Sequence, residues 1–350
     1  MRKNLVLLII IILSGLIMSA CNTQKPEPTL TSEPASTLLA TAANTLAPTN
    51  APKPTATFTP QPTNLPEPTE TIIPTTTAIP ALVETAQPTL VATQISEADQ
   101  MVQVYIPAGD FIMGSNDIEA QRSTNNGRAY PEIPVHTVYL DGYWIDKYEV
   151  TNEQYALCVT AGVCDPPFLL KSETRRHYFD NPEYANYPVI YVSWYMARTY
   201  CEWAGRRLPN EAEWEKAARG TDGRKYPWGN EKVSGERANF CDVNCPRTIA
   251  NSIFNDGYAD TSPVGNYPAG ASPYGVMDMS GNVWEWTSTI PKPYPYDPTD
   301  GRENLDVYAE RVWRGGPWSN GYWWIRSSIR YRSVPTYVWV NLGFRCAATK

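Results

Sequence analysis

The sequence predicts an irregular α+β domain with few helices, short antiparallel strands and long loops. Three segments carry helix signals, each opened by a capping residue and followed by glycine. The apolar runs that favour strands are short. Residues 165–188 contain four prolines, and residues 221–275 are rich in Gly, Pro, Asn and Asp. Loops this long are unusual in a compact domain unless they are functional or cross-linked.

The first 21 residues have the features of an export signal. Two basic residues precede an apolar run that ends at Met18, and two small residues lead into Cys21. This pattern resembles a bacterial lipoprotein signal, in which the cysteine is lipidated, although Met18 stands where leucine is usual. The alternative is a membrane anchor helix, for which the run is short against the roughly 20 residues of a bilayer span.

Residues 22–100 are predicted to form a disordered stalk. They contain 13 Pro and 19 Thr, whereas all 12 Trp and 22 Tyr lie after residue 100. Such a segment has too little apolar surface to offset the loss of chain entropy on folding. We therefore expect a folded domain, residues 101–350, held away from the membrane. Its 25 basic and 29 acidic residues argue against nucleic acid as a partner.

The domain begins with strand signals. Residues 101–115 alternate and turn at Gly109-Asp110, which predicts a β-hairpin. Residues 116–134 are polar and loop-like. Residues 135–145 predict a further strand that leads into Asp146.

Three helices are predicted from their ends. Thr151 caps the first, which stops near Gly162. Ser193 caps the second, which runs from residue 194 to 204 and is followed by Gly205. Asn210 caps the third, with Glu213 three residues later as in a capping box, and the helix ends at Gly220. Tryptophans on these helices are interpreted as core.

The end of the chain predicts three strands, over residues 311–314, 322–331 and 342–346. These strands cannot bury their apolar faces alone, so they must pair with earlier ones. The two loops between them are rich in Trp, Tyr, Ser and Asn.

Six cysteines remain once Cys21 is set aside, which in an exported domain suggests three disulfides. Spacing predicts two local pairs and leaves a third: Cys158–Cys164, Cys241–Cys245 and Cys201–Cys346. The alternative is metal binding by Cys241 and Cys245. The two histidines, His136 and His177, lie far from both in the sequence and are interpreted as solvated or structural.

Several motifs occur together in a known order. Residues 207–215 read RLPNEAEWE, which resembles RLPTEAEWE, and residues 281–286 read GNVWEW. RGG at 314–316 and GFRC at 343–346 follow. With Met113-Gly114 and residues 149–152, the domain resembles the sulfatase-modifying-factor family over about residues 102–348. The resemblance implies a variant of the C-type lectin fold and supports the Cys201–Cys346 pair.

Enzymes of that family oxidise a sulfatase cysteine to formylglycine with O2, using two cysteines that bind copper(I). Thiolates are the soft ligands that copper(I) requires. The corresponding positions are Asn320 and Ile325, and the serine usual after RGG is Pro317. We therefore expect no copper and no catalytic residues. Some relatives are non-haem iron enzymes, but no such ligand set is found in the sequence.

The resemblance also implies two calcium sites, for which hard oxygen ligands are needed. The first would use the side chains of Asp278 and Glu285 with the carbonyls of Gly281 and Val283. The second would use the side chains of Asn239 and Asp256 with the carbonyls of Phe240 and Tyr258. In the alternative, these carboxylates cap local turns without metal.

The terminal loops have the composition of a recognition surface, because Trp and Tyr give rigid contact area while Ser and Asn adapt their hydrogen bonds. The candidate ligand-binding residues are Trp318, Ser319, Asn320, Tyr322, Trp323, Trp324, Tyr337 and Trp339, with Tyr331 and Ser333 beside them. About half of the aromatic residues are expected to face the core instead. Diversification of these loops, as in related proteins, is a further possibility.

The leading hypothesis is a surface-tethered lipoprotein whose catalytically silent domain binds a protein or glycan at the cell envelope. An enzyme of different chemistry on the same scaffold, either a metal-dependent oxidase or a protein-modifying enzyme, is the alternative. In a third hypothesis the chain is only a structural spacer of the envelope.

Overall fold

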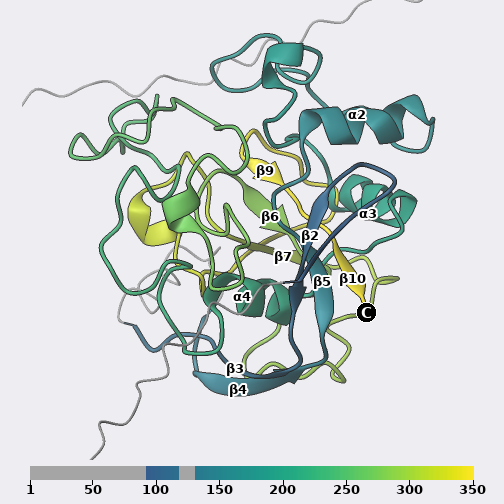
Figure 1. Cartoon of the computed structure of the whole chain (residues 1–350), viewed down its shortest axis with the longest axis vertical. Coiled ribbons are helices and arrows are strands. Elements are labelled where there is room, and N and C mark those ends of the chain that lie inside the picture. Colours follow the sequence, from purple (N-terminus) through teal and green to yellow (C-terminus); the bar gives the residue numbers. More distant parts are fainter. Residues whose placement is uncertain (1–91, 118–130) are drawn as a thin grey trace, which may run out of the picture. The chain divides into compact units, whose positions relative to one another are not determined.

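The computed structural model describes residues 92–117 and 131–350 (Figure 1). The predicted signal sequence, Cys21 and most of the predicted stalk lie outside these residues. The first strand, β1 (Thr93–Ile95), falls in the range assigned to the stalk and pairs with β2 (Val102–Ile106). The folded unit therefore begins before residue 101.

The first sheet joins the beginning of the domain to its end. Its strand order is β1-β2-β5-β10, all antiparallel, with β5 at Tyr143–Asp146 and β10 at Ala347–Thr349. The second sheet has two strands and is described below. The third sheet has the order β8-β7-β6-β9 and contains the terminal segments. Its strands are β6 (Trp284–Trp286), β7 (Arg311–Arg314), β8 (Tyr331–Ser333) and β9 (Leu342–Gly343). Only β6 and β9 in this sheet run parallel.

The predicted hairpin over 101–115 is wrong. Its two halves, β2 and β3 (Gly109–Met113), belong to different sheets, and β3 pairs with β4 (His136–Leu140). The ammonium of Lys216 donates to the carbonyls of Pro107 and Gly109, at 2.8 Å each, so the link between the halves is held by a side chain instead of a turn.

The predicted strand over 135–145 is also divided, into β4 and β5. The break falls at Gly142, where a Cβ would lie 2.1 Å from the hydroxyl of Tyr105. The chain can turn this corner only because the residue there has no side chain. The part of the predicted loop 116–134 that is described includes Glu132, which is buried.

The strand predicted over 322–331 is absent. Residues Tyr322–Trp324 form a 3₁₀ turn, and regular pairing begins only at β8. The reason is that the backbone between them binds a side chain, since the carbonyls of Ser327 and Ser328 accept from the Arg314 guanidinium at 2.8 and 3.1 Å. The segment predicted over 342–346 likewise yields only β9 before the chain crosses to the first sheet as β10.

All three predicted helices are confirmed. They are α2 (Asn152–Thr160), α3 (Trp194–Trp203) and α4 (Glu211–Arg219). Thr151, Ser193 and Asn210 cap them through their side chains, and Glu213 completes a capping box with Asn210. These signals are local, which is why the sequence alone predicts them. Two further 3₁₀ turns, Pro182–Tyr184 and Pro268–Gly270, interrupt the long loops.

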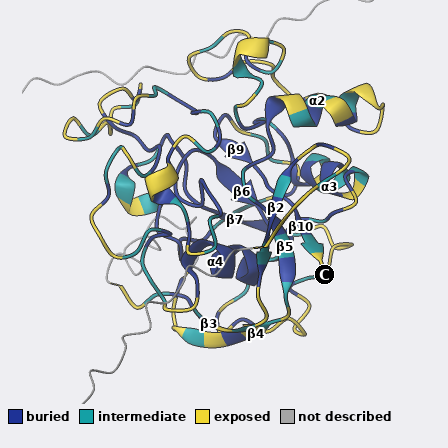
Figure 2. Cartoon of the chain, in the orientation of Figure 1, coloured by how far each residue is buried: buried dark blue, intermediate teal, exposed yellow. Residues whose placement is uncertain are grey.

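Figure 2 shows α4 and the strands β6, β7 and β9 as buried, while α2 carries an exposed face. The largest apolar cluster packs α3 against the third sheet through Trp194, Trp284, Trp286 and Trp313. This placement confirms the core interpretation of the helix tryptophan Trp194, and it combines with the short strands to confirm the irregular α+β class.

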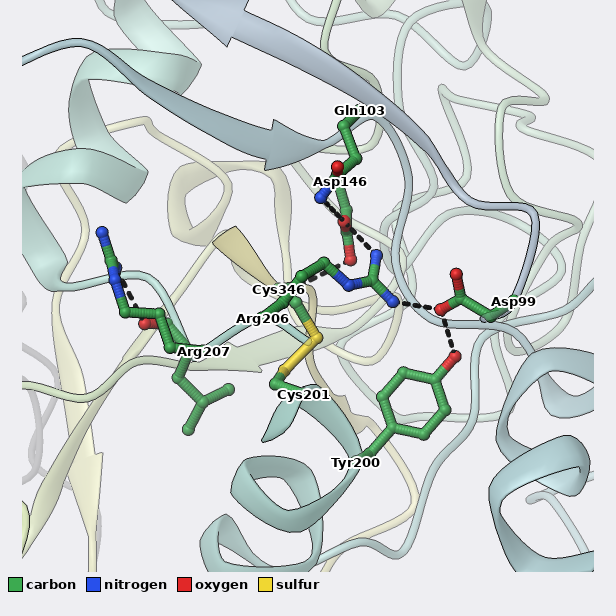
Figure 3. Close-up of a disulfide and its surroundings, with 9 residues drawn as sticks. Asp99, Gln103, Asp146, Tyr200, Cys201, Arg206, Arg207 and Cys346 are labelled. Atoms are coloured by element: carbon green, nitrogen blue, oxygen red, sulfur yellow. Dashed lines mark hydrogen bonds and ion pairs between the residues drawn. A yellow bond between two sulfur atoms is a disulfide. The ribbon is translucent and has the colours of Figure 1, made fainter. Parts of the chain in front are cut away.

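All three predicted disulfides are present: Cys158–Cys164, Cys201–Cys346 and Cys241–Cys245. Figure 3 shows Cys201–Cys346 beside a buried charge network, in which Arg206 contacts both Asp99 and Asp146. Asp99 also accepts a hydrogen bond from Tyr200 at 2.6 Å. The disulfide and the network thus fix the beginning and the end of the domain to α3.

The disulfides indicate an extracytoplasmic protein, because they persist in oxidising compartments. Within residues 92–117 and 131–350, none of the helices has the length and apolar character that crossing a bilayer requires.

Candidate functional site

The two positions that would carry thiols in the family's oxidases have different surroundings. Asn320 lies at the surface of a cleft, and its carbonyl accepts from the backbone N–H of Cys241 at 2.9 Å. Ile325 is fully buried in an apolar cluster with Phe240 and Tyr226. Every cysteine in the described part of the domain is in a disulfide.

The cleft beside Asn320 has a volume of about 530 Å³, which lies in the range of small-molecule sites. Its aromatic lining residues are Trp284, Trp313, Tyr331, Tyr337 and Trp339. Its charged lining residues are Arg247, Glu310 and Arg332. Small polar residues complete it: Ser319, Asn320, Ser333 and Asn341. We refer to it as the terminal cleft.

The aromatic residues of the terminal cleft form a stack. Tyr331 lies 5.3 Å from Trp313, Trp313 lies 5.5 Å from Tyr337, and Tyr337 lies 5.7 Å from Trp339, measured between ring centroids. The angles between these rings are 31°, 30° and 22°, so the Tyr337–Trp339 pair is stacked and the other two pairs are tilted. Offset stacking is one of the arrangements that aromatic rings prefer. The stack runs from the core outward to Trp339, which is exposed.

The small polar side chains form a chain of hydrogen bonds. Asn341 donates from Nδ2 to the hydroxyl of Ser319 at 2.6 Å, and Ser319 donates to Oδ1 of Asn320 at 3.2 Å. Oδ1 of Asn341 is buried and has no hydrogen-bond partner among the described residues. A buried acceptor without a partner costs free energy, so it indicates a site that a water or ligand donor can complete.

Charged side chains border the same cleft. Arg332 forms an ion pair with Glu310 at 2.8 Å, and Arg247 forms one with Glu173 at 3.0 Å. Arg247 also lies over the ring of Trp318, 5.5 Å from its centroid. These pairs are half exposed and can turn toward a ligand at low cost.

The predicted recognition residues are therefore only partly brought together. Six of them line the terminal cleft: Ser319, Asn320, Tyr331, Ser333, Tyr337 and Trp339. Trp318 is buried, Tyr322 packs on Phe254, and Trp324 joins the core beside Trp284. Trp323 is exposed but does not line the cleft.

The sequence analysis missed six lining residues: Arg247, Trp284, Glu310, Trp313, Arg332 and Asn341. Arg247 comes from the loop next to the Cys241–Cys245 disulfide, far from the terminal segments in sequence. No periodic pattern marks it, because only the tertiary fold brings that loop to the cleft. Arg332 and Asn341 lie in the terminal stretch itself and could have been included by their position.

The donor set of the second calcium site fits a cation. Oδ1 of Asn239 is buried without a hydrogen-bond partner in the described part of the chain. Burial raises the pKa of Asp256 to about 8, and the neighbouring Asp242 carboxylate contributes to the rise. Oδ2 of Asp256 accepts the backbone N–H of Phe240 and Oδ1 accepts that of Tyr258, so the carboxylate is held between these two residues. A hard cation here would compensate the buried carboxylate.

The first calcium site fits less well. Both oxygens of Glu285 are already bonded, to the guanidinium of Arg345 and the indole of Trp214 at 2.7 Å. Asp278 remains poorly compensated, since burial raises its pKa to about 6. Burial also raises the pKa of Glu149 well above its usual range, with Asp278 as the next cause. A cation at this site would therefore depend on Asp278 more than on Glu285.

The two histidines lie apart from both sites. His136 is in β4, where Nδ1 donates to the carbonyl of Pro134 and Nε2 accepts the N–H of Tyr296 at 2.8 Å. His177 is exposed and lies near Asp180. In the described residues, no group of three or more His, Cys, Asp or Glu side chains is arranged to hold a metal ion.

The sulfatase-modifying factor enzyme 1-like domain matches residues 87–350. A formylglycine-generating enzyme of Streptomyces coelicolor is 35% identical over 293 residues, which cover 70% of this chain and 88% of the relative. An inactive C-alpha-formylglycine-generating enzyme 2 of Mus musculus is 29% identical over 297 residues, covering 73% of this chain and 88% of the relative. The solved structure of PvdO from Pseudomonas aeruginosa has a TM-score of 0.58 and 28% identity, covering 74% of this chain and 98% of PvdO. The chain therefore belongs to the sulfatase-modifying factor enzyme 1-like family, and the C-type-lectin-like α+β fold that the motifs imply is confirmed.

Proposed function

We propose that this chain is an exported lipoprotein whose sulfatase-modifying-factor domain has lost oxidase chemistry and binds a ligand in the terminal cleft. The observation that carries the proposal is the pair of replacements at Asn320 and Ile325. An amide and an aliphatic side chain cannot supply thiolates, and the described cysteines are all in disulfides.

The retained cleft supports binding without that chemistry. A concave, aromatic and polar site lies beside Asn320, one of the two replaced positions. Aromatic residues with amide and hydroxyl groups are typical of recognition surfaces. A relative from Mus musculus is itself named inactive, so loss of activity on this scaffold has a precedent by name.

Two further features belong to the proposal. Cys21 would carry the lipid that attaches the chain to the membrane, and the Thr/Pro-rich segment would hold the domain away from it. Calcium would bind at Asn239 and Asp256, where the donor set fits it, and would hold the loop 221–275 in place. Its role would be structural, because no carboxylate of that site lines the terminal cleft.

Metal analysis of the purified protein combined with thiol titration tests this proposal. We expect stoichiometric calcium, no copper or iron, and no free thiol before or after denaturation without reductant. Copper or iron bound at one equivalent, or two reactive thiols, would contradict it and favour an oxidase of different chemistry. Titration of the same sample after reduction is the control that detects all six domain cysteines.

A further inference from the structure

Among the described residues that line the terminal cleft, none has an aliphatic side chain. Every residue in it is aromatic, charged, or a small hydroxyl or amide residue. Sites for small apolar ligands are lined mainly by hydrophobic side chains, and peptide grooves offer apolar pockets to side-chain anchors. The terminal cleft instead suits a ligand with a flat C–H face and a rim of hydrogen-bonding groups.

Trp339 provides the flat surface. It is 47% exposed, and its ring stacks on that of Tyr337, which in turn lies tilted against the ring of Trp313. Its backbone is held as well, because its carbonyl accepts from the N–H of Tyr191 at 3.1 Å. The ring is therefore fixed before a ligand arrives, and little side-chain entropy is lost when a second flat ring packs on it.

The hydrogen-bonding groups are also fixed in advance. Asn341 is only 6% exposed and offers a buried acceptor, Oδ1, that has no partner among the described residues. Its Nδ2 is held by Ser319, so the direction of the amide is set. Glu310 and Arg332, paired at 2.8 Å, add an acceptor and a donor at the rim. Hydroxyl groups on a ligand can both donate and accept hydrogen bonds, so they can pair with the acceptors on Asn341 and Glu310 and with the donor on Arg332.

The charge of the cleft favours an uncharged ligand. Arg332 is compensated by Glu310, and Arg247 by Glu173. The whole chain has a formal net charge of −7, which repels polyanions at long range.

We propose that the terminal cleft binds a neutral saccharide, with one pyranose ring packed on Trp339 and hydroxyl groups bonded to Asn341 and the Glu310–Arg332 pair. This inference rests on the proposed binding function of the same cleft and gives its ligand class. Saccharide rings present flat C–H faces to aromatic rings and a rim of hydroxyls to amide and charged groups, which matches the lining.

The test is binding of the full chain, purified in detergent, to an array of neutral and acidic oligosaccharides. Calorimetry with the best neutral oligosaccharide then gives the affinity. We expect neutral oligosaccharides to bind and acidic ones to bind more weakly. Trp339→Ala should weaken binding at least about tenfold, as loss of a stacking partner would. Asn341→Ala should weaken it by a similar factor, because it removes the buried acceptor.

Tyr139→Ala is the matched control. Tyr139 is an exposed aromatic residue, on β4, and it does not line the cleft. It should bind like the unmodified chain. Circular dichroism should show that both alanine variants in the cleft are folded, which is expected for Trp339 because its side chain is exposed.

A phage-displayed peptide library applied to the same protein distinguishes failure of the saccharide inference from failure of the proposed binding function. If no oligosaccharide binds but selected peptides do, and Trp339→Ala abolishes their binding, the saccharide inference fails and the binding function stands. If neither class binds, both fail. Oligosaccharide binding that Trp339→Ala and Asn341→Ala leave unchanged would also overturn the inference.

Discussion

Buried ion pairs between individual side chains hold the loops of this domain in place. Arg326 donates to both oxygens of Glu132, at 2.8 and 2.9 Å, and Arg345 does the same with Glu285 at 2.7 Å. Such charge-assisted bidentate bonds are strong and directional. The Arg326–Glu132 pair joins segments that share no strand pairing, and the Arg345–Glu285 pair reinforces the pairing of β6 with β9. Such bonds help a domain with short strands to keep long loops ordered. Among the residues that the structure describes, six arginines are less than 2% exposed: Arg302, Arg311, Arg314, Arg326, Arg330 and Arg345.

His136 gives a pH-dependent prediction at this scale. Burial lowers its pKa from the usual value of 6.5, and its neutral ring is needed because Nε2 accepts the N–H of Tyr296. Below pH 6.5 the imidazole binds a proton more readily in the unfolded chain than in the folded one, so the contribution of His136 to stability should fall as the pH falls through 6.5 toward the lower folded value. Buried carboxyls of raised pKa, such as Asp278, contribute in the opposite direction. Urea midpoints measured between pH 7.5 and 5 test this.

His136→Gln is the matched variant, since its amide oxygen can accept the same N–H without titrating. As the pH is lowered from 7.5 to 5, the urea midpoint of this variant should rise relative to that of the unmodified chain. An equal change of midpoint in both proteins would contradict a role of His136.

At the scale of elements, α4 shows that a helix with many charged residues can be buried on all sides when those charges are paired. All nine of its residues are buried, although five are charged. Glu211 contacts Arg330 and Arg314, and Glu215 contacts Arg314 and Arg219. The helix is therefore a charged core element that joins β7 to the segment before β8.

Glu211→Ala should destabilise the domain by about 3–5 kcal/mol, because it leaves buried guanidinium groups without a partner. Glu202→Ala is the control, since its i,i+4 pair with Arg198 is largely exposed and should contribute less than about 1 kcal/mol. Urea unfolding of the two variants measures the difference. Equal effects would mean that the α4 network is not a stability determinant.

Elements whose signals are local were predictable, and those that depend on distant partners were not. Thr151, Ser193 and Asn210 mark helix starts through their own caps, and the sequence identified all three. The segment 322–331 has a strand composition, yet Arg314 occupies the carbonyls of Ser327 and Ser328, which no local pattern reveals. The terminal cleft was likewise predictable only in part. Trp339 lies in one of the terminal loops that the sequence indicates, whereas Arg247 comes from a loop distant in sequence.

At the scale of the whole molecule, the Cys201–Cys346 disulfide joins α3 to the end of the chain across a separation of 145 residues. The two local disulfides close loops of 6 and 4 residues. On the chain-entropy account, a cross-link stabilises more when it closes a longer loop.

Replacing Cys201 and Cys346 together by alanine should therefore cost about 5 kcal/mol, against about 2 kcal/mol for replacing Cys158 and Cys164. Guanidinium unfolding under non-reducing conditions measures both. A larger loss from the local pair would mean that native-state packing, and not loop closure, determines the effect.

The central claim is that this family member binds without oxidising a cysteine. The most direct measurement is mass spectrometry of a cysteine-containing sulfatase peptide after incubation with the purified chain, copper(I) and O2. The formylglycine-generating enzyme of Streptomyces coelicolor serves as the positive control. We predict that this chain leaves the mass of the peptide unchanged, and conversion of its cysteine to formylglycine above the level without protein would contradict the claim.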